Sequence, residues 1–243
     1  MVDELAERIA GVRRAVEDAA ARVGRDPAGI RIVAVTKALS PGVVSAAIAA
    51  GLTEIGENYV QEARTKQGAV GRRGVWHLIG TLQRNKARAA VAIFDHVQTV
   101  DSDAVAGTLD REAERARRRL PVLIQVNVSG EATKSGVAPE RVEALARGVL
   151  LRPSLLLQGL MAVPPIPEDP DASRPYFRLL RGVRDRTANV LGVELPHLSM
   201  GMSDDFLVAV EEGATLLRLG RALFGARGPG ASRPGSSPGG EGS

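Results

Sequence analysis

Eight short apolar runs of strand length alternate with helix-like stretches along almost the whole chain, and this alternation limits the fold more than any other feature. The runs are rich in Val, Ile and Leu and do not alternate apolar with polar residues, which is typical of strands buried on both faces of a parallel sheet. They cover Arg31–Thr36, Thr53–Gly56, Val75–Ile79, His96–Thr99, Val122–Asn127, Leu156–Ala162, His197–Met200 and Leu216–Gly220.

Helical patterns fill the intervals between these runs. They cover Pro41–Ala50, Tyr59–Val70, Gln83–Ala92, Ser102–Arg118, Pro139–Leu150, Pro175–Leu191 and Ser203–Glu212, with an extra helix over about Glu4–Arg22 before the first strand. Eight strands alternating with helices in 243 residues favour an α/β fold closed as a single (β/α)8 TIM barrel. The alternative is a doubly wound open sheet, but the turn after the first strand reads TKALSP and lacks the glycines of a dinucleotide-binding turn.

Composition predicts one domain over residues 1–227 and a disordered Gly/Pro/Ser tail over residues 228–243. The chain has no cysteine, which excludes disulfides, thiolate zinc sites and cysteine nucleophiles and fits a reducing compartment. The N-terminal residues are charged throughout, and no apolar run approaches the roughly 20 residues of a membrane span. We therefore expect a cytoplasmic protein without a membrane partner.

Part of the net charge of +4 comes from a basic run between Arg111 and Arg119. Such a run is either a nucleic-acid patch or the solvated face of a helix. Glu112 and Glu114 lie within it, and no aromatic residues interleave with the arginines as they do on single-strand platforms. The solvated helix face is the favoured interpretation, and no nucleic-acid partner is expected.

Lys37 directly follows the first predicted strand and is the first candidate for chemistry. The carboxyl ends of barrel strands carry the active sites of such folds. Apolar strand residues beside a lysine disfavour its charged form, and a neutral amine is what a Schiff base with an aldehyde requires. By position alone, however, the favoured interpretation is a lysine whose amine extends from a strand end into solvent.

The segment HLSMGMSDDF places Ser199, Gly201 and Met202 between the seventh strand and a helix. Gly201 allows close approach of the backbone to a ligand, and exposed N–H groups at a helix start suit a phosphate. An ordinary helix start with an acidic first turn explains the segment equally well, because Asp204 and Asp205 already answer the helix dipole.

The segment LLRLGRALFG places Gly220 and Arg221 at the end of the eighth strand. The loops after strands seven and eight are the frequent phosphate site of barrels, so two independent segments fall where the fold predicts one joint site. Arg218 lies on an apolar strand two residues before Gly220. A buried arginine there needs a partner, such as a ligand ring nitrogen or an acidic side chain.

Polar residues after the other strands are weaker candidates, and Asn58 after the second strand is one of them. His77 and His197 lie in strands, where a hydrogen-bonded core histidine is the favoured interpretation. The histidines never form an i, i+4 metal pair, so no zinc site is expected. Neither a G-x-S-x-G elbow nor a G-x-x-x-x-G-K motif occurs.

Seven segments, taken in order, resemble the signature blocks of the pyridoxal 5′-phosphate (PLP) homeostasis protein family. They are AVTKALSP, GENYVQEA, WHLIGTLQRNK, QVNVSGEATKSGV, GLMAVPP, LSMGMSDDF and RLGRALFG. The resemblance spans roughly Ile32 to Arg227, nearly the whole predicted fold. The family in turn resembles the N-terminal barrel of alanine racemase, a fold-type III PLP enzyme.

By this resemblance Lys37 carries PLP as a Schiff base, and Asn58 lines the cofactor pocket. Arg218 would face the pyridine nitrogen and keep it unprotonated, which weakens the ring as an electron sink. The phosphate would be held, largely through backbone N–H groups, by Ser199, Gly201, Met202, Gly220 and Arg221.

The same resemblance bears on catalysis. Alanine racemase uses a tyrosine base from a second domain, whereas the only tyrosines here are Tyr59 and Tyr176, so no partner base for Lys37 is evident. The favoured reading is a non-catalytic PLP carrier or buffer in intracellular PLP homeostasis, a monomer with apo PLP-dependent enzymes as transient partners. The alternative is an amino-acid racemase or related fold-type III enzyme with weak activity.

Overall fold

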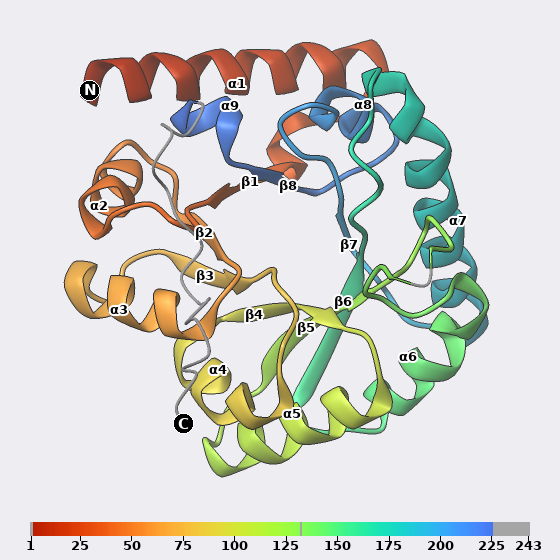
Figure 1. Ribbon diagram of the computed structural model, residues 1–243. Coiled ribbons are helices and arrows are strands. Elements are labelled where there is room, and N and C mark those ends of the chain that lie inside the picture. The colour runs from red at the N-terminus through yellow and green to blue at the C-terminus, as the bar shows by residue number, and fades with distance from the viewer. Residues whose placement is uncertain (1, 132, 226–243) are drawn as a thin grey trace, which may run out of the picture.

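The computed structural model describes residues 2–131 and 133–225, and eight parallel strands of this part of the chain close into a barrel (Figure 1). Each strand pairs with the next along the chain, and β1 pairs with β8 to close the ring. The strands are β1 Arg31–Val35, β2 Glu54–Glu57, β3 Val75–Leu78, β4 His96–Val100, β5 Leu120–Gln125, β6 Leu155–Met161, β7 His197–Ser199 and β8 Leu216–Leu219. The predicted TIM barrel is confirmed, and all eight predicted strands are present within two residues at each end.

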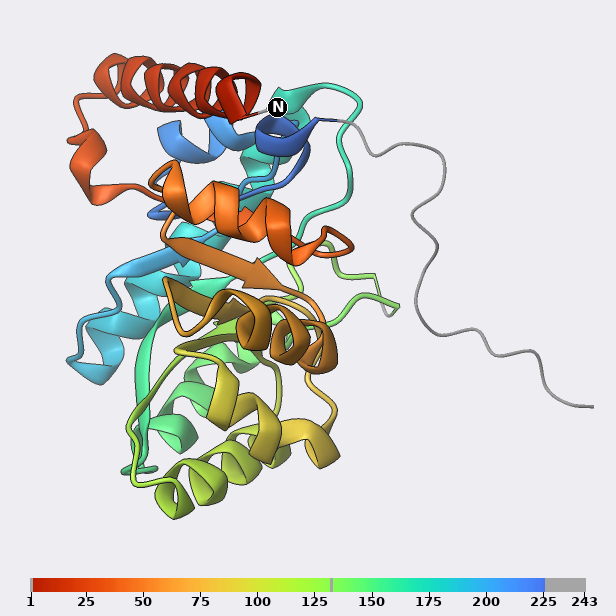
Figure 2. The ribbon, with the colours of Figure 1, turned by 90° about the vertical axis from the view of Figure 1, so that its left-hand side faces the viewer.

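Helices form a ring around the barrel (Figures 1 and 2). They are α1 Val2–Arg22, α2 Pro41–Ala49, α3 Val60–Val70, α4 Ala87–Ile93, α5 Asp103–Arg115, α6 Val142–Leu150, α7 Arg174–Leu191, α8 Phe206–Glu211 and α9 Arg221–Phe224. Four predicted helix bounds are wrong by three or more residues. Helices α4 and α6 begin later than Gln83 and Pro139 because a 3-10 turn precedes each of them, and α5 ends at Arg115 rather than Arg118. Helix α8 begins at Phe206 because residues 203–205 form a turn.

The predicted extra helix α1 packs across α8 and α9 at one side of the barrel (Figure 1). Its buried residues Leu5, Ile9, Val12 and Val16 recur every three to four positions, which gives the helix one apolar face. The guanidinium of Arg25, just after the helix, donates to the carbonyl oxygen of Ala214 at 2.8 Å and so ties this end of α1 to the strand that follows α8.

Two separate apolar clusters form the core. The larger one lies between the barrel and its helices and contains the largest buried side chains, among them Trp76 and Phe94. The smaller one comprises Val33, Leu123, Met161 and Leu216. These four residues come from β1, β5, β6 and β8, which can meet only inside the barrel. Other buried side chains of the barrel strands, among them His77, Gln98 and Arg218, are polar.

The basic run between Arg111 and Arg119 does not form one continuous face. Arg115 forms an exposed ion pair with Glu112 at 2.7 Å, whereas the half-buried Arg118 donates to the carbonyl oxygen of Phe94 at 3.1 Å. Arg118 therefore fastens the end of α5 to the end of α4.

The predicted tail over residues 228–243 lies outside the described residues, so the domain boundary at residue 227 stays a prediction. None of the helices in residues 2–131 and 133–225 is long and apolar enough to cross a membrane.

All three histidines of the chain gather at the amino-terminal end of the barrel strands. The rings of His77 and His96 are stacked with their centroids 4.6 Å apart, and His197 lies 2.9 Å from the guanidinium of Arg31. Burial, with the nearby His77 ring and the charge of Arg31, lowers the pKa of His96 to about 3. Burial and Arg31 lower the pKa of His197 to about 4.

We expect the protein to lose stability as the pH falls below about 6.5, the ordinary histidine pKa. Between that pH and about 3, His96 is neutral in the folded state and protonated in the unfolded chain, so acid favours unfolding. The upper limit of this contribution is about 1.4 kcal/mol per pH unit. Urea unfolding across this range will measure it, with His96→Gln as the comparison. A slope in the variant equal to that of the parent would contradict the assignment to His96.

Candidate cofactor site

The eight predicted site residues lie on four strands that are neighbours in the closed barrel. Ser199, Gly201 and Met202 belong to the end of β7, Arg218, Gly220 and Arg221 to that of β8, Lys37 to that of β1 and Asn58 to that of β2. The barrel order β7-β8-β1-β2 therefore brings these residues to one sector of the carboxyl-terminal face, the face turned to the viewer in Figure 1.

Lys37 lies in a tight turn immediately after β1. The N–H of Leu39 donates to the carbonyl oxygen of Thr36 at 3.0 Å, and Ala38 adopts a positive φ of 60°. A left-handed conformation is unfavourable for a residue with a Cβ atom, so surrounding contacts must hold the turn in place. Lys37 itself is half-buried at the start of this turn.

A buried ion-pair network supplies those contacts, and we call it the Lys66 clamp. The amine of Lys66 lies 2.5 Å from the carbonyl oxygen of Thr36, 2.7 Å from Glu57 Oε1 and 2.6 Å from Glu62 Oε1. Glu62 Oε1 also accepts the N–H of Ala38 at 2.5 Å. The clamp thus fixes the backbone on both sides of Lys37.

Glu57 is the most buried member of the clamp, and its carboxylate is fully inaccessible to solvent. Burial raises the pKa of the Glu57 carboxyl, and the hydrogen bonds from Lys66 and Thr36 oppose that rise. In the described part of the chain, Glu57 Oε2 has no hydrogen-bond partner, so all its bonds pass through Oε1. Removing Lys66 would take away the cation that pairs with this carboxylate at 2.7 Å.

The loop after β7 is organised by the buried Asp205. One oxygen of its carboxylate accepts the N–H of Met202 at 2.7 Å, and the other accepts the hydroxyl of Ser173 on the segment before α7 at 2.7 Å. Gly201 has a φ of 90°, which a residue with a side chain rarely adopts. The expectation that Asp205 lies in the first turn of α8 is wrong, because this carboxylate closes the loop that precedes the helix.

Ser203 connects the loops after β7 and β8, and the sequence-based list of site residues does not include it. Its hydroxyl accepts the N–H of Ala222 at 3.1 Å, near the start of α9. Arg221 pairs with Asp204 across the same two loops. The two predicted anion-binding segments therefore form one joined surface beside Gly201 and Gly220.

Arg218 is buried in the barrel, with only 4% of its surface exposed. Its guanidinium donates to the hydroxyl of Ser199 and to the carbonyl oxygen of Ala162, both at 2.7 Å. Burial lowers the pKa of Arg218 to about 10, and Asp205 partly opposes this, so the side chain stays positively charged at neutral pH. Ser199 is completely buried, its hydroxyl is engaged inside the barrel, and its carbonyl oxygen accepts the N–H of Ala162 at 3.1 Å.

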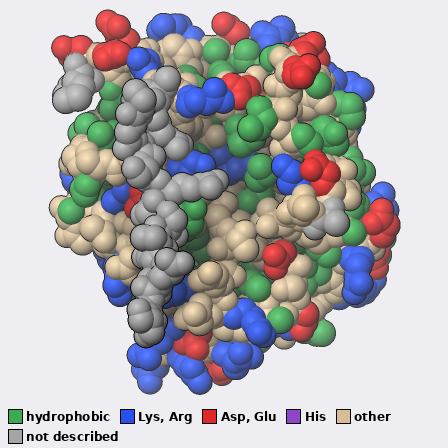
Figure 3. Space-filling model, in the orientation of Figure 1, with side chains coloured by type: hydrophobic (Ala, Val, Ile, Leu, Met, Phe, Trp, Pro, Cys, Tyr) green, Lys and Arg blue, Asp and Glu red, His purple; other side chains and the backbone are tan. Residues whose placement is uncertain are grey.

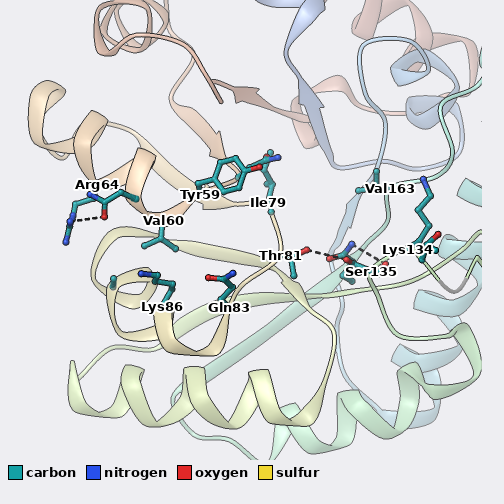
Figure 4. Close-up of a pocket in the computed structure, with 16 residues that line it drawn as sticks. Tyr59, Val60, Arg64, Ile79, Thr81, Gln83, Lys86, Lys134, Ser135 and Val163 are labelled. Atoms are coloured by element: carbon teal, nitrogen blue, oxygen red, sulfur yellow. Dashed lines mark hydrogen bonds between the residues drawn. The ribbon is translucent and has the colours of Figure 1, made fainter. Parts of the chain in front are cut away.

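A cavity of about 860 Å³ opens next to this sector, between the ends of β2, β3, β5 and β6 (Figure 4). Asn58 belongs both to its wall and to the predicted cofactor residues. The hydroxyl groups of Thr81 and Ser135 lie 3.3 Å apart in its wall. Lys86 and Lys134 supply positive charge to opposite parts of the wall. The corresponding face is hollowed near its centre in Figure 3.

Among residues 2–131 and 133–225, no group of three or more His, Asp or Glu side chains is arranged to hold a metal ion, and the absence of a histidine metal site stays a prediction. His77 contacts Glu54 and Gln98 instead.

The fold, a (β/α)8 barrel with a lysine just after β1, defines a class of proteins, and the comparison with known proteins identifies this class. The family model described as the alanine racemase N-terminal domain matches residues 10–228. The D-threonine aldolase of Filomicrobium marinum shares this fold, with 17% identity and a TM-score of 0.75 over 92% of this chain and 60% of that one.

Higher identity is found with curated proteins and structures of one family. The pyridoxal phosphate homeostasis protein of Pseudomonas aeruginosa is 44% identical over 229 residues, which are 93% of this chain and 97% of that protein. PipY of Synechococcus elongatus, solved with PLP bound, is 33% identical with a TM-score of 0.80 over 91% of this chain and all of that one. The chain belongs to the pyridoxal phosphate homeostasis protein family.

Proposed function

We propose that this protein binds PLP as a Schiff base on Lys37 and carries or buffers the cofactor for intracellular PLP homeostasis. The observation that carries the proposal is the convergence of Lys37, the two joined loops and Arg218 on the neighbouring ends of β7, β8, β1 and β2. PLP supplies an aldehyde, a phosphate dianion and a ring nitrogen, and the chain offers a chemically matched group for each.

The donor set fits each part of the cofactor. Lys37 provides an amine on a turn whose backbone is fixed by the Lys66 clamp. Backbone N–H groups of the loops that contain Gly201 and Gly220 suit the phosphate. The buried cation of Arg218 disfavours a second positive charge next to it, so a ring nitrogen facing it would stay unprotonated. Asn58 would line the pocket from the cavity side.

We propose a carrier rather than a racemase. Two-base racemisation needs a second base on the other side of the substrate from the lysine. Tyr176 lies on α7 and packs against the outer core, and Tyr59 is 56% exposed at the cavity rim. Neither provides a buried base opposite Lys37. Sustained exchange of amino-acid α-protons in heavy water, well above that of free PLP, would contradict the carrier proposal.

Transient delivery to apo PLP-dependent enzymes, action as a monomer and a cytoplasmic location complete the proposal. The absence of cysteine is compatible with a reducing compartment. An aldehyde that is held covalently but reversibly is protected from other amines and can still be released to a recipient enzyme.

We expect PLP to form a visible absorbance band with the wild-type protein, and we expect Lys37→Ala to abolish it. Borohydride reduction followed by peptide mass spectrometry should place the pyridoxyl adduct on Lys37. The other three lysines, Lys66, Lys86 and Lys134, are internal controls in the same digest. An adduct elsewhere, or a band of unchanged intensity in Lys37→Ala, would refute the assignment.

A further inference from the structure

A chain of hydrogen-bonded polar side chains runs through the barrel, and we call it the inner polar chain. Barrel interiors of this fold are usually filled by branched apolar residues. Here six strands each contribute one polar side chain instead. The members are Arg218 of β8, Ser199 of β7, Gln98 of β4, His77 of β3, Glu54 of β2 and Arg31 of β1.

The links of this chain are short and mostly buried. Arg218 reaches Ser199 at 2.7 Å, and the hydroxyl of Ser199 reaches Gln98 Oε1 at 2.6 Å. The amide nitrogen of Gln98 lies 3.0 Å from His77 Nδ1. His77, Gln98 and Ser199 are completely buried. The chain thus connects the carboxyl-terminal face, where Arg218 lies, with the middle of the barrel.

Charged groups anchor the half of the inner polar chain that is farther from Arg218. His77 Nε2 lies 2.5 Å from Glu54 Oε2, and the other oxygen of Glu54 accepts from the guanidinium of Arg31 at 3.1 Å. Burial raises the pKa of Glu54, but the hydrogen bond to His77 and the charge of Arg31 outweigh it and lower that pKa overall. Glu54 is therefore an ionised acceptor that fixes the orientation of the His77 ring through Nε2.

Donors and acceptors along the chain form an unbroken series when the Gln98 amide oxygen faces Ser199 and His77 is the neutral tautomer with its proton on Nε2. A guanidinium only donates, so the oxygen of Ser199 accepts from Arg218, and its hydroxyl proton goes to Gln98 Oε1. The Gln98 nitrogen then donates to His77 Nδ1, and the proton on His77 Nε2 points to Glu54. The reversed amide would place two N–H donors on the Ser199 oxygen and would remove Gln98 as the acceptor of the hydroxyl proton. Each donor thus points from Arg218 toward Glu54, which strengthens the series cooperatively.

We propose that Gln98 is a positioning residue that, acting through Ser199, holds the Arg218 guanidinium opposite the ring nitrogen of bound PLP. This inference rests on the proposed function. It adds Gln98 to that function, a residue outside the sequence segments that point to the site. The hydroxyl of Ser199 cannot hold Arg218 in a fixed direction by itself, because a hydroxyl rotates freely until an acceptor fixes its proton. Gln98 is that acceptor, and the anchored His77 fixes Gln98 in turn.

The test uses full-length protein loaded with PLP that carries an isotopic label at the ring nitrogen. In the wild type, the nuclear magnetic resonance signal of that nitrogen should stay in the unprotonated range through neutral pH. In Gln98→Leu it should titrate, and the dissociation constant for PLP should rise by about 3- to 10-fold, which corresponds to the loss of one hydrogen bond. Thr99→Val is the matched control, because Thr99 is a buried neighbour on β4 that bonds to the carbonyl oxygen of Gly80 instead.

Two further measurements keep the outcome decisive. If Gln98→Leu does not fold, Ser199→Ala replaces it, because it removes a smaller group from the inner polar chain. In Ser199→Ala, too, the ring nitrogen should titrate and the dissociation constant for PLP should rise. Proton exchange at the Arg218 guanidinium can be compared without PLP and should be faster in Gln98→Leu than in Thr99→Val. Absence of PLP binding by the wild type would refute the proposed function. Normal binding, with ring-nitrogen signals and guanidinium exchange identical in Gln98→Leu and Thr99→Val, would overturn the positioning role alone.

Discussion

Replacing Lys66 by methionine is expected to lower the free energy of unfolding by about 3–5 kcal/mol, the usual cost of breaking a buried ion pair from one side. Methionine nearly matches the lysine stem in volume, so the loss is of charge and hydrogen bonds rather than packing. The variant leaves Glu57 buried without the cation of Lys66 and removes one of the two hydrogen bonds to the carbonyl oxygen of Thr36. A loss of this size is a large fraction of the roughly 5–15 kcal/mol that stabilises a typical domain.

Urea unfolding of paired variants will check this expectation. Lys86→Met removes an exposed lysine and should change stability by no more than about 0.5 kcal/mol. The double variant Lys66→Met/Glu57→Gln removes both charges and should recover part of the loss, because an uncompensated carboxylate is the main cause. If Lys66→Met unfolds at nearly the same urea concentration as Lys86→Met, the clamp is not a significant source of stability.

The Lys66 clamp is a feature of the surroundings of Lys37 that its position in the sequence does not reveal. From the sequence, a lysine after a strand looks like a solvated side chain. The structure adds a turn with Ala38 at positive φ, held from both sides by Glu62 and Lys66. Glu62 and Lys66 are visible in the sequence as an ordinary i, i+4 pair on a helix, and such pairs are usually exposed. Nothing local distinguishes this buried pair, because its burial depends on α3 packing beside β1 and β2.

The barrel itself was predictable because its signal is local and repeated. Each strand is an apolar run bounded by turn residues, and eight such runs alternating with helices leave few topologies. One of the bounds that failed, at the start of α8, depends on Ser173, which lies about 30 residues earlier in the chain and bonds to Asp205. Contacts of this kind leave no pattern in the segment that they shape.

The candidate site also has residues that could be predicted from the sequence and residues that could not. Lys37, Gly201, Gly220 and Arg218 could be singled out because strand ends and glycine turns mark the functional face of a barrel. Gln98 could not, because it sits inside a strand that reads as ordinary core, and its partners Ser199 and His77 come from other strands. Polar residues inside predicted barrel strands therefore deserve to be tested as possible connections between distant strands.

Replacing Gly201 by alanine is expected to lower the free energy of unfolding by about 2–5 kcal/mol and to weaken PLP binding. About 1–2 kcal/mol comes from forcing a residue with a Cβ atom to a φ of 90°. About 1–3 kcal/mol comes from overpacking, because the new Cβ would lie 2.5 Å from the Cβ of Ala209 and 3.2 Å from Leu217 Cδ2. Neither neighbour can move easily, since both are fully buried.

Binding should fall with stability because Gly201 also helps to place the residues that we propose for the cofactor site. Its carbonyl oxygen accepts the N–H of Arg218 at 3.0 Å, so a shift of the loop moves the β8 strand end as well. Gly182→Ala is the matched control, since Gly182 lies within α7 with open space around it and should gain about 0.5–1 kcal/mol from the same change. Chemical denaturation and PLP titration of both variants decide the matter. Equal stability and equal affinity in the two would mean that the loop after β7 tolerates a side chain at this position and does not need its left-handed turn.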